Sequence, residues 1–342
     1  MKPIKLVAVV GPTASGKTAL AIDIAKKFSG EIVSCDSMQL YDFAPIATAA
    51  PTDREKAAAP HHMVGILKAG ESFSVSKYAD AARQVIGDIS ERGHLPVLCG
   101  GTGLYYSAVV DNIKFLEDGF DPSIRNDLLK RAEREGLYSL YDELCKIDPV
   151  SAKKIEKNDK KRILRGLEIF YSTGKTLSEQ TALSRAEPSP YELFAIGITY
   201  RDRQKLYDRI NLRVDKMIEQ GLIDEAYEIF KKNPAGTGMQ AIGVKELYPY
   251  FRKEVSLEQA VETIKMESRR YAKRQLTWFR RDERIHWIYA DEAGQKNNFE
   301  NIEIPIEKFE KHDIMSLSRG CTKKYLGAAP KKERIFNYGK KH

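Results

Sequence analysis

The sequence of 342 residues has no long hydrophobic run and few cysteines. No stretch of about 18 apolar residues appears, which argues against a transmembrane helix. The first residues lead directly into the apolar segment "KLVAVV", so we expect no signal peptide. The cysteines, Cys35, Cys99, Cys145 and Cys321, are far apart and form no C-x-x-C pair. We therefore expect reduced, structural thiols in a cytoplasmic protein without a zinc site and without a membrane anchor.

A strong charge bias is also missing from most of the chain. The net charge is +8, but residues 318–342 hold eight lysines and arginines and one acid, a net +7. The preceding residues are almost neutral, so the overall charge is poor evidence for a nucleic-acid surface. Two segments, 153–165 and 267–284, are locally basic, and the second also carries aromatic residues. Such clusters suit a phosphate backbone and stacked bases, although a solvated helix face explains either cluster equally well.

The segment "GPTASGKT" at residues 11–18 fits the phosphate-binding pattern G-x-x-x-x-G-K-[ST]. It follows a Val-rich run typical of a buried parallel strand and precedes "TALAIDIAKKF", whose apolar positions have helical spacing. Backbone N–H groups at the helix start would bind phosphate oxygens, Lys17 would add a charge, and the Thr18 hydroxyl is suited to ligate Mg²⁺. The predicted phosphate-binding residues are Gly11, Pro12, Thr13, Ala14, Ser15, Gly16, Lys17 and Thr18.

One element of ordinary P-loop nucleotide hydrolases is absent. Those enzymes hold Mg²⁺ with an acidic residue at the end of a second strand. The candidate strand, "HLPVLC" at residues 94–99, runs into "GGTGLYY" without Asp or Glu. This counts against a conventional ATPase or GTPase and leaves open a kinase with another arrangement.

Strand and helix patterns alternate over residues 1–110, which predicts the front half of an open parallel sheet. From about 118 to 190 the pattern is helical and charged, starting with a helix that Asp121 caps. "LFAIGIT" at 193–199 returns to the sheet, long helices follow, and "IHWIYA" is a candidate last strand. We therefore predict an α/β fold with a P-loop NTPase-like parallel sheet core flanked by helices. The expected parts are the core at 1–117 and 191–317, a helical insertion at 118–190, and a basic, disordered tail at 318–342.

Asp36 lies just past the second predicted strand, in "EIVSCDSMQLY". Open α/β sheets bind ligands at the carboxyl ends of their strands, so we expect this carboxylate beside the phosphate loop. There it is suited to act as a general base or as a partner of Mg²⁺. A helix cap is the competing interpretation of Asp36 followed by Ser37.

Seven segments together resemble one family. They are "GPTASGKT", "SCDSMQLY", "PHH", "GGTGLYY", "NDKKRILRGLEIFYSTGK", "LYDRINLRVDKMIEQGLIDEA" and "AKRQLTWFRRD". In this order and spacing they are similar to the tRNA dimethylallyltransferases, also called tRNA isopentenyltransferases. The resemblance covers about residues 4–290 and is to the bacterial form, because the zinc finger of eukaryotic members is absent.

The resemblance implies that the loop binds dimethylallyl diphosphate rather than ATP. The dimethylallyl group would go to the exocyclic N6 of adenine 37, next to the anticodon in tRNAs that read U-starting codons. An amine conjugated with a ring is a weak nucleophile, so it needs a proton acceptor, a role for which Asp36 is placed. Loop amides, Lys17, Arg213 and Mg²⁺ would stabilise the charge that grows on the diphosphate. The implied catalytic residues are Asp36, Thr13, Lys17 and Arg213, with Mg²⁺ as the cofactor on Thr18.

The same resemblance implies a binding site for the anticodon stem-loop of tRNA. The helical insertion would hold the stem, and the target base would leave its stack to enter the protein. We expect the protein to act as a monomer. The implied tRNA-binding residues are Asp36, Ser37, Met38, Gln39, Thr102, Arg125, Lys161, Arg162, Ile163, Leu164 and Arg165.

Four positions depart from the usual family pattern. The chain has Ala47 in place of the common Gly and Ala50 in place of the common Lys. It also has Gly65 in place of Asp and Val244 in place of an aromatic residue. None of them lies in the phosphate loop or replaces Asp36. The implied chemistry is therefore retained, and the departures bear on the fit to tRNA or on the substrate range.

Three other functions stay open at this point. A P-loop kinase of a small metabolite shares the loop and an aspartate at a strand end, but it does not explain "GGTGLYY" or the basic clusters. An adenylate isopentenyltransferase shares the catalytic half, whereas the basic insertion favours a macromolecular acceptor. A non-catalytic RNA-binding protein would not need the intact loop, Asp36 and Arg213.

Overall fold

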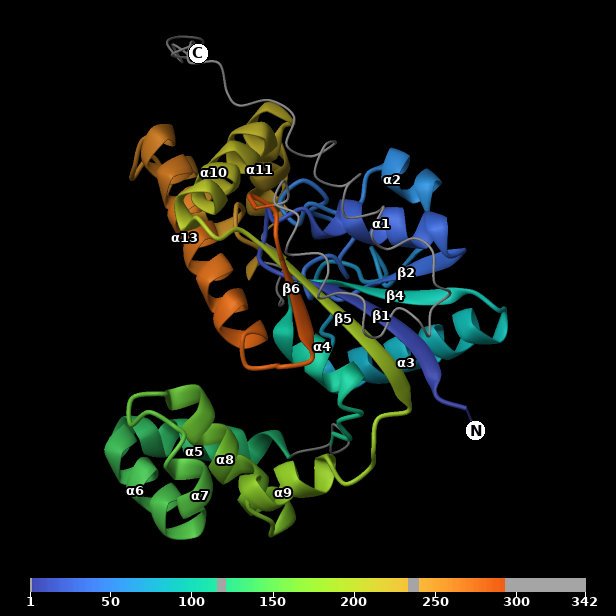
Figure 1. Cartoon of the computed structure of the whole chain (residues 1–342). Helices are drawn as coiled ribbons and strands as arrows, with labels where there is room; N and C mark the ends of the chain where they lie inside the picture. Colours follow the sequence, from blue (N-terminus) through green and yellow to red (C-terminus); the bar gives the residue numbers. More distant parts are fainter. Residues whose placement is uncertain (1, 116–120, 233–239, 293–342) are drawn as a thin grey trace. The chain divides into compact units, whose positions relative to one another are not determined.

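The computed structural model describes residues 2–115, 121–232 and 240–292 (Figure 1). Within these ranges the strands form one six-stranded sheet in the order β3-β2-β4-β1-β5-β6, and the registered pairs are parallel. The predicted parallel sheet is confirmed, including the last strand, whereas the expected tail at 318–342 lies outside the described residues. The strands are β1 (Ile4–Val10), β2 (Gly30–Ser34), β3 (His61–His62), β4 (Leu95–Gly100), β5 (Tyr191–Thr199) and β6 (Ile285–Tyr289).

Helices connect these strands. In the first part of the chain they are α1 (Lys17–Lys27), α2 (Asp53–Ala58), α3 (Val75–Glu91) and α4 (Gly103–Val110). After β5 they are α10 (Arg203–Glu219), α11 (Leu222–Lys232), the 3₁₀ turn η2 (Lys245–Leu247), α12 (Tyr248–Phe251) and α13 (Leu257–Phe279). Among the described residues, no helix combines the length and the apolar character that crossing a membrane requires.

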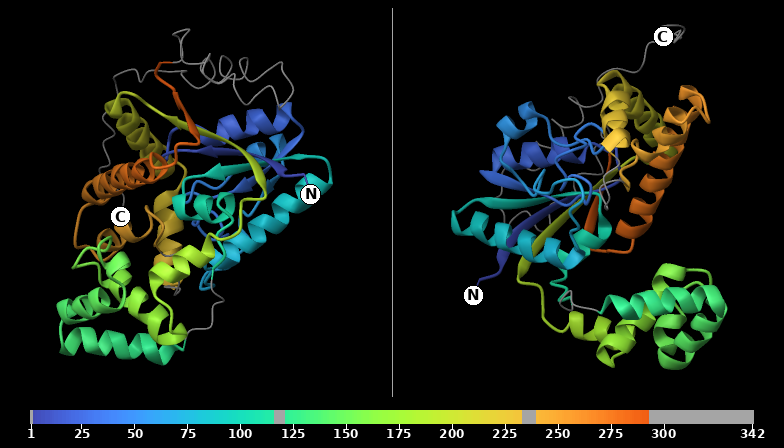
Figure 2. Two further views of the ribbon diagram at one scale, coloured as in Figure 1. Left: turned by 60° about the horizontal axis from the view of Figure 1, so that its bottom comes forward. Right: turned by 180° about the vertical axis from the view of Figure 1, so that it is seen from behind.

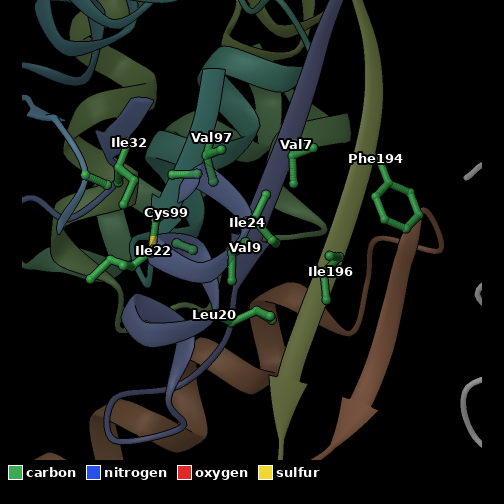
Figure 3. Packing of buried hydrophobic residues seen from close by; sticks show 13 residues of the cluster. Val7, Val9, Leu20, Ile22, Ile24, Ile32, Val97, Cys99, Phe194 and Ile196 are labelled. Carbon is green, nitrogen blue, oxygen red and sulfur yellow. The ribbon is translucent and has the colours of Figure 1, made fainter. Parts of the chain in front are cut away.

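Strand β1 is buried on both of its faces, as its Val-rich sequence predicts. Val7 and Val9 point toward α1, where they join Leu20 and Ile24 in one apolar cluster (Figure 3). The alternate residues of the strand are also fully buried. A parallel sheet that is covered on both faces favours such continuous apolar strands. The buried strand β1 in turn gives the loop that follows it a rigid support.

The described chain divides into two compact units. The sheet unit contains residues 2–72, 85–103 and the described residues from 192 onward, and the helical unit contains 73–84 and the described residues of 104–191. The helical unit is therefore wider than the predicted insertion at 118–190. The reason is local packing: Tyr78 stacks on Tyr105 with ring centroids 3.9 Å apart, and Arg83 Nη2 donates to the carbonyl oxygens of Ala108 and Ile113.

The helical unit has its own apolar core. Its main helices are α5 (Pro122–Arg134), α6 (Leu137–Ile147), α7 (Pro149–Ala152), α8 (Lys160–Thr173) and α9 (Leu177–Ser184), drawn in green shades in Figure 2. The predicted start of α5 is confirmed, because Asp121 accepts a hydrogen bond from the Ser123 N–H at 2.8 Å. The buried core residues are Leu128, Leu140, Leu144, Ala152, Ile155, Ile163, Leu164 and Leu167.

A buried carboxylate ties the short edge strand β3 to the sheet. Glu31 of β2 accepts hydrogen bonds from His62 Nε2 and His94 Nδ1, each at 2.6 Å, and from Arg92 Nη2 at 2.9 Å. Burial opposes ionisation of Glu31, but the donors outweigh it and hold the pKa of this carboxyl at about 2. This cluster anchors β3, whose other histidine, His61, lines the pocket described below.

Candidate active site

A pocket of about 890 Å³ lies in the sheet unit, where strands β1, β2 and β4 end. Thr13 follows β1, Asp36 follows β2, and Gly100 is the last residue of β4. Because carboxyl ends of parallel strands meet at one edge of the sheet, segments distant in sequence converge there. The structure brings together on this pocket the predicted catalytic residues Asp36, Thr13, Lys17 and Arg213.

The phosphate loop has the backbone conformation that its glycines permit. Gly11 has a φ of 148°, and a Cβ there would lie 2.4 Å from the Ile198 carbonyl oxygen. Gly16, with a φ of 101°, sits at the start of α1 and has no side chain to cap the first N–H groups. These groups and the helix dipole therefore remain available to an anion.

Lys17 and Arg213 place two positive charges on the pocket wall. Enclosure by protein lowers the pKa of Lys17, and repulsion from Arg213 lowers it further. Burial also lowers the pKa of Arg213, although attraction by Asp36 opposes this effect. Neither cation forms an ion pair with a described carboxylate, and the Lys17 ammonium donates to the Pro12 carbonyl oxygen at 3.3 Å. A bound anion would stabilise both charged forms.

Asp36 begins a tight turn directly after β2. Its Oδ1 accepts the N–H of Met38 at 3.0 Å, so one carboxylate oxygen orients the turn. The next residue, Ser37, donates its N–H to Thr102 Oγ1 at 3.1 Å, and the Thr102 N–H binds the Cys35 carbonyl oxygen. Thr102 therefore supports the turn that carries Asp36.

Tyr271 of α13 joins the same group of side chains. Burial raises the pKa of its phenol, the negative charge of Asp36 raises it further, and a hydrogen bond with Thr102 opposes the rise. The phenol is therefore a neutral hydroxyl group beside Asp36 and serves as a hydrogen-bond partner rather than as a charge. The family motif "AKRQLTWFRRD" begins one residue after Tyr271, and the sequence pointed to this residue only as one of the aromatics in the basic segment 267–284.

Gln39, a predicted tRNA-binding residue, has its side chain engaged inside the protein. It accepts a hydrogen bond from Ser34 Oγ at 2.9 Å and donates to the Ala49 carbonyl oxygen at 3.0 Å. It thereby holds the loop 45–52, which lines the pocket. Glu225 of α11 holds the same loop by accepting the N–H groups of Ile46 and Ala47 at 2.9 and 2.8 Å.

Two of the departures from the family pattern share one apolar cluster. Val244 is fully buried together with Ala44 and Ile229, and Ala47 packs against them. Alanine in place of glycine at position 47 adds a methyl group to this cluster. Valine in place of an aromatic residue at position 244 removes volume from the same cluster, so the two changes act in opposite directions. Gly65 has a φ of 63°, a conformation that favours glycine over the usual aspartate. Ala50 lines the pocket, and nothing in the structure explains why it replaces lysine.

His61 is a pocket residue to which the sequence assigned no role. Its Nδ1 lies 2.8 Å from the Ala59 carbonyl oxygen, which places the proton on Nδ1. Burial lowers the pKa of the ring, so the imidazole is neutral. Its Nε2 is buried without a partner among the described residues and is therefore an acceptor on the pocket wall.

The helical unit presents only part of the expected tRNA site. Arg125 and Arg165 both bind the carboxylate of Glu168, at 3.2 and 3.0 Å. Lys161 and Arg162 are exposed on the first turn of α8. Ile163 and Leu164, also expected at the tRNA site, have their side chains buried in the helical core, so these side chains do not form a surface.

The donors at the pocket suit Mg²⁺ only together with a phosphate ligand. Thr18 and Asp36 line the same pocket, yet the described residues contain no group of three or more His, Cys, Asp or Glu able to hold a metal. Mg²⁺ is usually bound by one or two protein oxygens together with substrate phosphates and water. The residues therefore fit an ion that a diphosphate brings with it, with Thr18 as the predicted protein ligand.

Comparison with known proteins gives matches over most of the chain. Residues 39–282 match the model of a family described as IPP transferase, and residues 4–59 match that of Isopentenyl transferase. A tRNA dimethylallyltransferase of Caldanaerobacter subterraneus subsp. tengcongensis is 45% identical over 292 residues, 84% of this chain and 93% of the relative. Another, from Halalkalibacterium halodurans, is 47% identical over 285 residues, 83% of this chain and 90% of the relative.

Solved structures give the same result. The full-length tRNA isopentenylpyrophosphate transferase from Bacillus halodurans is 41% identical, with a TM-score of 0.63, over 94% of this chain and 99% of that chain. A eukaryotic dimethylallyltransferase acting on tRNA is 29% identical, with a TM-score of 0.75, over 89% of this chain and 79% of that chain. The likeness thus extends well beyond the phosphate loop.

Proposed function

This chain belongs to the IPP transferase family, which includes the tRNA dimethylallyltransferases, and from that membership we propose its reaction. The enzyme transfers the dimethylallyl group of dimethylallyl diphosphate to N6 of adenine 37 in tRNAs that read U-starting codons. One observation carries the proposal: the phosphate loop, the Asp36 carboxylate and two cations, neither of which pairs with a carboxylate of the described residues, face one pocket. Such a pocket suits a donor with an anionic leaving group and an acceptor that loses a proton.

The diphosphate of the donor binds at the phosphate loop. The N–H groups at the start of α1 and the ammonium of Lys17 contact its oxygens, and the planar guanidinium of Arg213 is suited to bind two oxygens at once. Mg²⁺ on Thr18 supplies further positive charge to the leaving group when it is bound. Thr13 lies at the same wall of the pocket.

Transfer forms one bond and breaks another. The N6 amine attacks the allylic carbon, the carbon–oxygen bond breaks, and its electron pair leaves with the diphosphate. Asp36 accepts the N6 proton, because a positively charged amine would otherwise build up at the acceptor. The negative charge on the leaving group grows as that bond breaks, so Lys17 and Arg213 stabilise the transition state more than the ground state.

The acceptor is a macromolecule in this proposal. The exposed Lys161 and Arg162 and the arginines held on Glu168 suit contacts with the phosphate backbone of the anticodon stem. Donor site and proton acceptor both lie within one sheet unit, so we infer that a monomer is sufficient. We propose that it acts in the cytoplasm, where its tRNA substrate is found. The turn after β4 contains no acid, which disfavours a small-metabolite kinase that would hold its metal there.

The test is mass spectrometry of nucleosides from tRNA that has been incubated with the protein, dimethylallyl diphosphate and Mg²⁺. We expect adenosine enlarged by one C5H8 unit, and only in tRNAs that read U-starting codons. ATP in place of the donor should leave the tRNA unchanged. Wild-type protein that binds Mg-ATP tightly and produces no modified nucleoside would overturn the proposal in favour of a kinase.

A further inference from the structure

Helix α13 closely approaches the turn between β4 and α4 at two glycines. A Cβ on Gly101 would lie 2.0 Å from Gln275 Nε2, and a Cβ on Gly103 would lie 2.2 Å from Cδ1 of the Trp278 indole. Tyr271, one turn before Gln275 on the same helix, lies near Thr102, the residue between the two glycines. Residues 271, 275 and 278 thus form one stripe of α13 that covers the turn.

Gln275 makes two hydrogen bonds that join separate loops. The residue is only 4% exposed. Its Oε1 accepts the N–H of Thr13 in the phosphate loop at 2.8 Å, and its Nε2 donates to the Gly101 carbonyl oxygen at 3.0 Å. The Thr13 amide is therefore committed to Gln275 rather than free for an anion, whereas no described side chain caps the amides at the start of α1.

The contacts of Gln275 continue to the proton acceptor. Gly101 precedes Thr102, whose hydroxyl accepts the Ser37 N–H beside Asp36. One amide side chain therefore connects the loop that binds the leaving group with the turn that carries the base. Buried hydrogen bonds of this kind restrict both segments, because breaking one leaves an unpaired buried group.

We propose that Gln275 is a positioning residue that sets the separation between the phosphate loop and the turn carrying Asp36. This role rests on the proposed transfer reaction. The reacting carbon must lie between the leaving group and the amine that Asp36 deprotonates, so a small change in that separation slows transfer. The binding of the two substrates depends less on this separation, because each substrate contacts either the phosphate loop or the turn that carries Asp36.

Two variants of similar size separate the two hydrogen bonds. Gln275→Met loses both bonds. Gln275→Glu keeps an acceptor for the Thr13 N–H but, while ionised, turns an oxygen toward the Gly101 carbonyl. When the introduced carboxyl is protonated it can donate to that carbonyl and restore the pattern. Thr277→Ala, an exposed change on the same helix, is the matched control.

The experiment measures single-turnover transfer at saturating tRNA and donor across a range of pH, together with the dissociation constants of both substrates. We expect Gln275→Met to slow transfer by about 10- to 100-fold, with the tRNA dissociation constant changed less than about threefold. The rate of Gln275→Glu relative to wild type should rise as the pH falls. Thr277→Ala should match wild type at every pH.

The outcomes distinguish positioning from a merely structural role. Positioning is overturned if folded Gln275→Met transfers within about twofold of wild type, or if Gln275→Glu shows no recovery at lower pH. It is also overturned if both variants fail to fold. A wild-type protein that transfers nothing contradicts the proposed function instead, so the two failures are told apart.

Discussion

The buried Glu31 cluster leads to a prediction about stability and its dependence on pH. Replacing Glu31 by Gln removes the charge that His62, His94 and Arg92 surround. The pKa of this carboxyl falls from an ordinary 4.5 to about 2 in the folded protein. One pKa unit corresponds to about 1.4 kcal/mol, so the ionised Glu31 contributes roughly 3 kcal/mol to the free energy of unfolding.

The pH range follows from the direction of this change. Because the folded-state pKa lies below the unfolded value, the contribution is complete above a pH of 4.5 and is lost as the pH falls toward 2. We therefore expect Glu31→Gln to lower the free energy of unfolding by about 3 kcal/mol at neutral pH. The difference from wild type should shrink as the pH falls below the unfolded value.

Urea unfolding of both proteins at a series of pH values measures this difference directly. Glu91→Gln is the matched control, because it makes the same chemical change at an exposed position of α3 and should alter stability by less than about 0.5 kcal/mol. A loss below about 1 kcal/mol for Glu31→Gln at neutral pH, or a loss that does not change on acidification, would refute the reasoning.

Three further predictions concern the reaction and its substrates. Asp36→Ala should lower the single-turnover rate by about 10²- to 10⁴-fold with tRNA affinity changed only a few-fold, and a rate near wild type would assign the base elsewhere. Arg213→Ala should raise the donor concentration needed for half-saturation and slow transfer, because this cation faces the leaving group; a change confined to tRNA affinity would place Arg213 in the RNA site. Deleting residues 320–342, which carry most of the net charge, should weaken tRNA binding and leave the transfer rate at saturation unchanged. The slope of log K against log[salt] should become shallower by about 0.7 to 0.9 for each lost phosphate contact. A salt dependence equal to that of the full chain would show that these residues do not contact tRNA.

The sheet and the centre of the pocket were predictable because their signals are local. The phosphate loop and Asp36 each follow an apolar strand, and parallel strands bring their carboxyl ends to one edge. Arg213 came from the family motif alone, since nothing in its own helix pattern indicates a ligand. The structure adds its position on the same pocket wall.

The supporting residues could not be read from the sequence, because their partners are distant in the chain. Gln275 bonds Thr13 across 262 positions, and Glu225 bonds Ile46 across 179. The spacing of apolar and polar residues along the sequence predicts helices and strands, but it does not predict such a pairing. Ile163 and Leu164 are a different case: their burial follows from the helical spacing of apolar residues in α8, which the basic character of the segment concealed.

The order of the strands also determines how the chain can assemble during synthesis. Strand β1 lies between β4 and β5, and roughly 90 residues separate those two neighbours in the chain. At about 5–20 residues per second, β1 exposes one unpaired, Val-rich edge for roughly 5–20 s after β4 has been made. Such an edge is a template for wrong pairing with another chain. The time needed to synthesise the helical unit therefore determines how long one edge of β1 stays unpaired before β5 is available. Slow codons within the helical unit would lengthen this time.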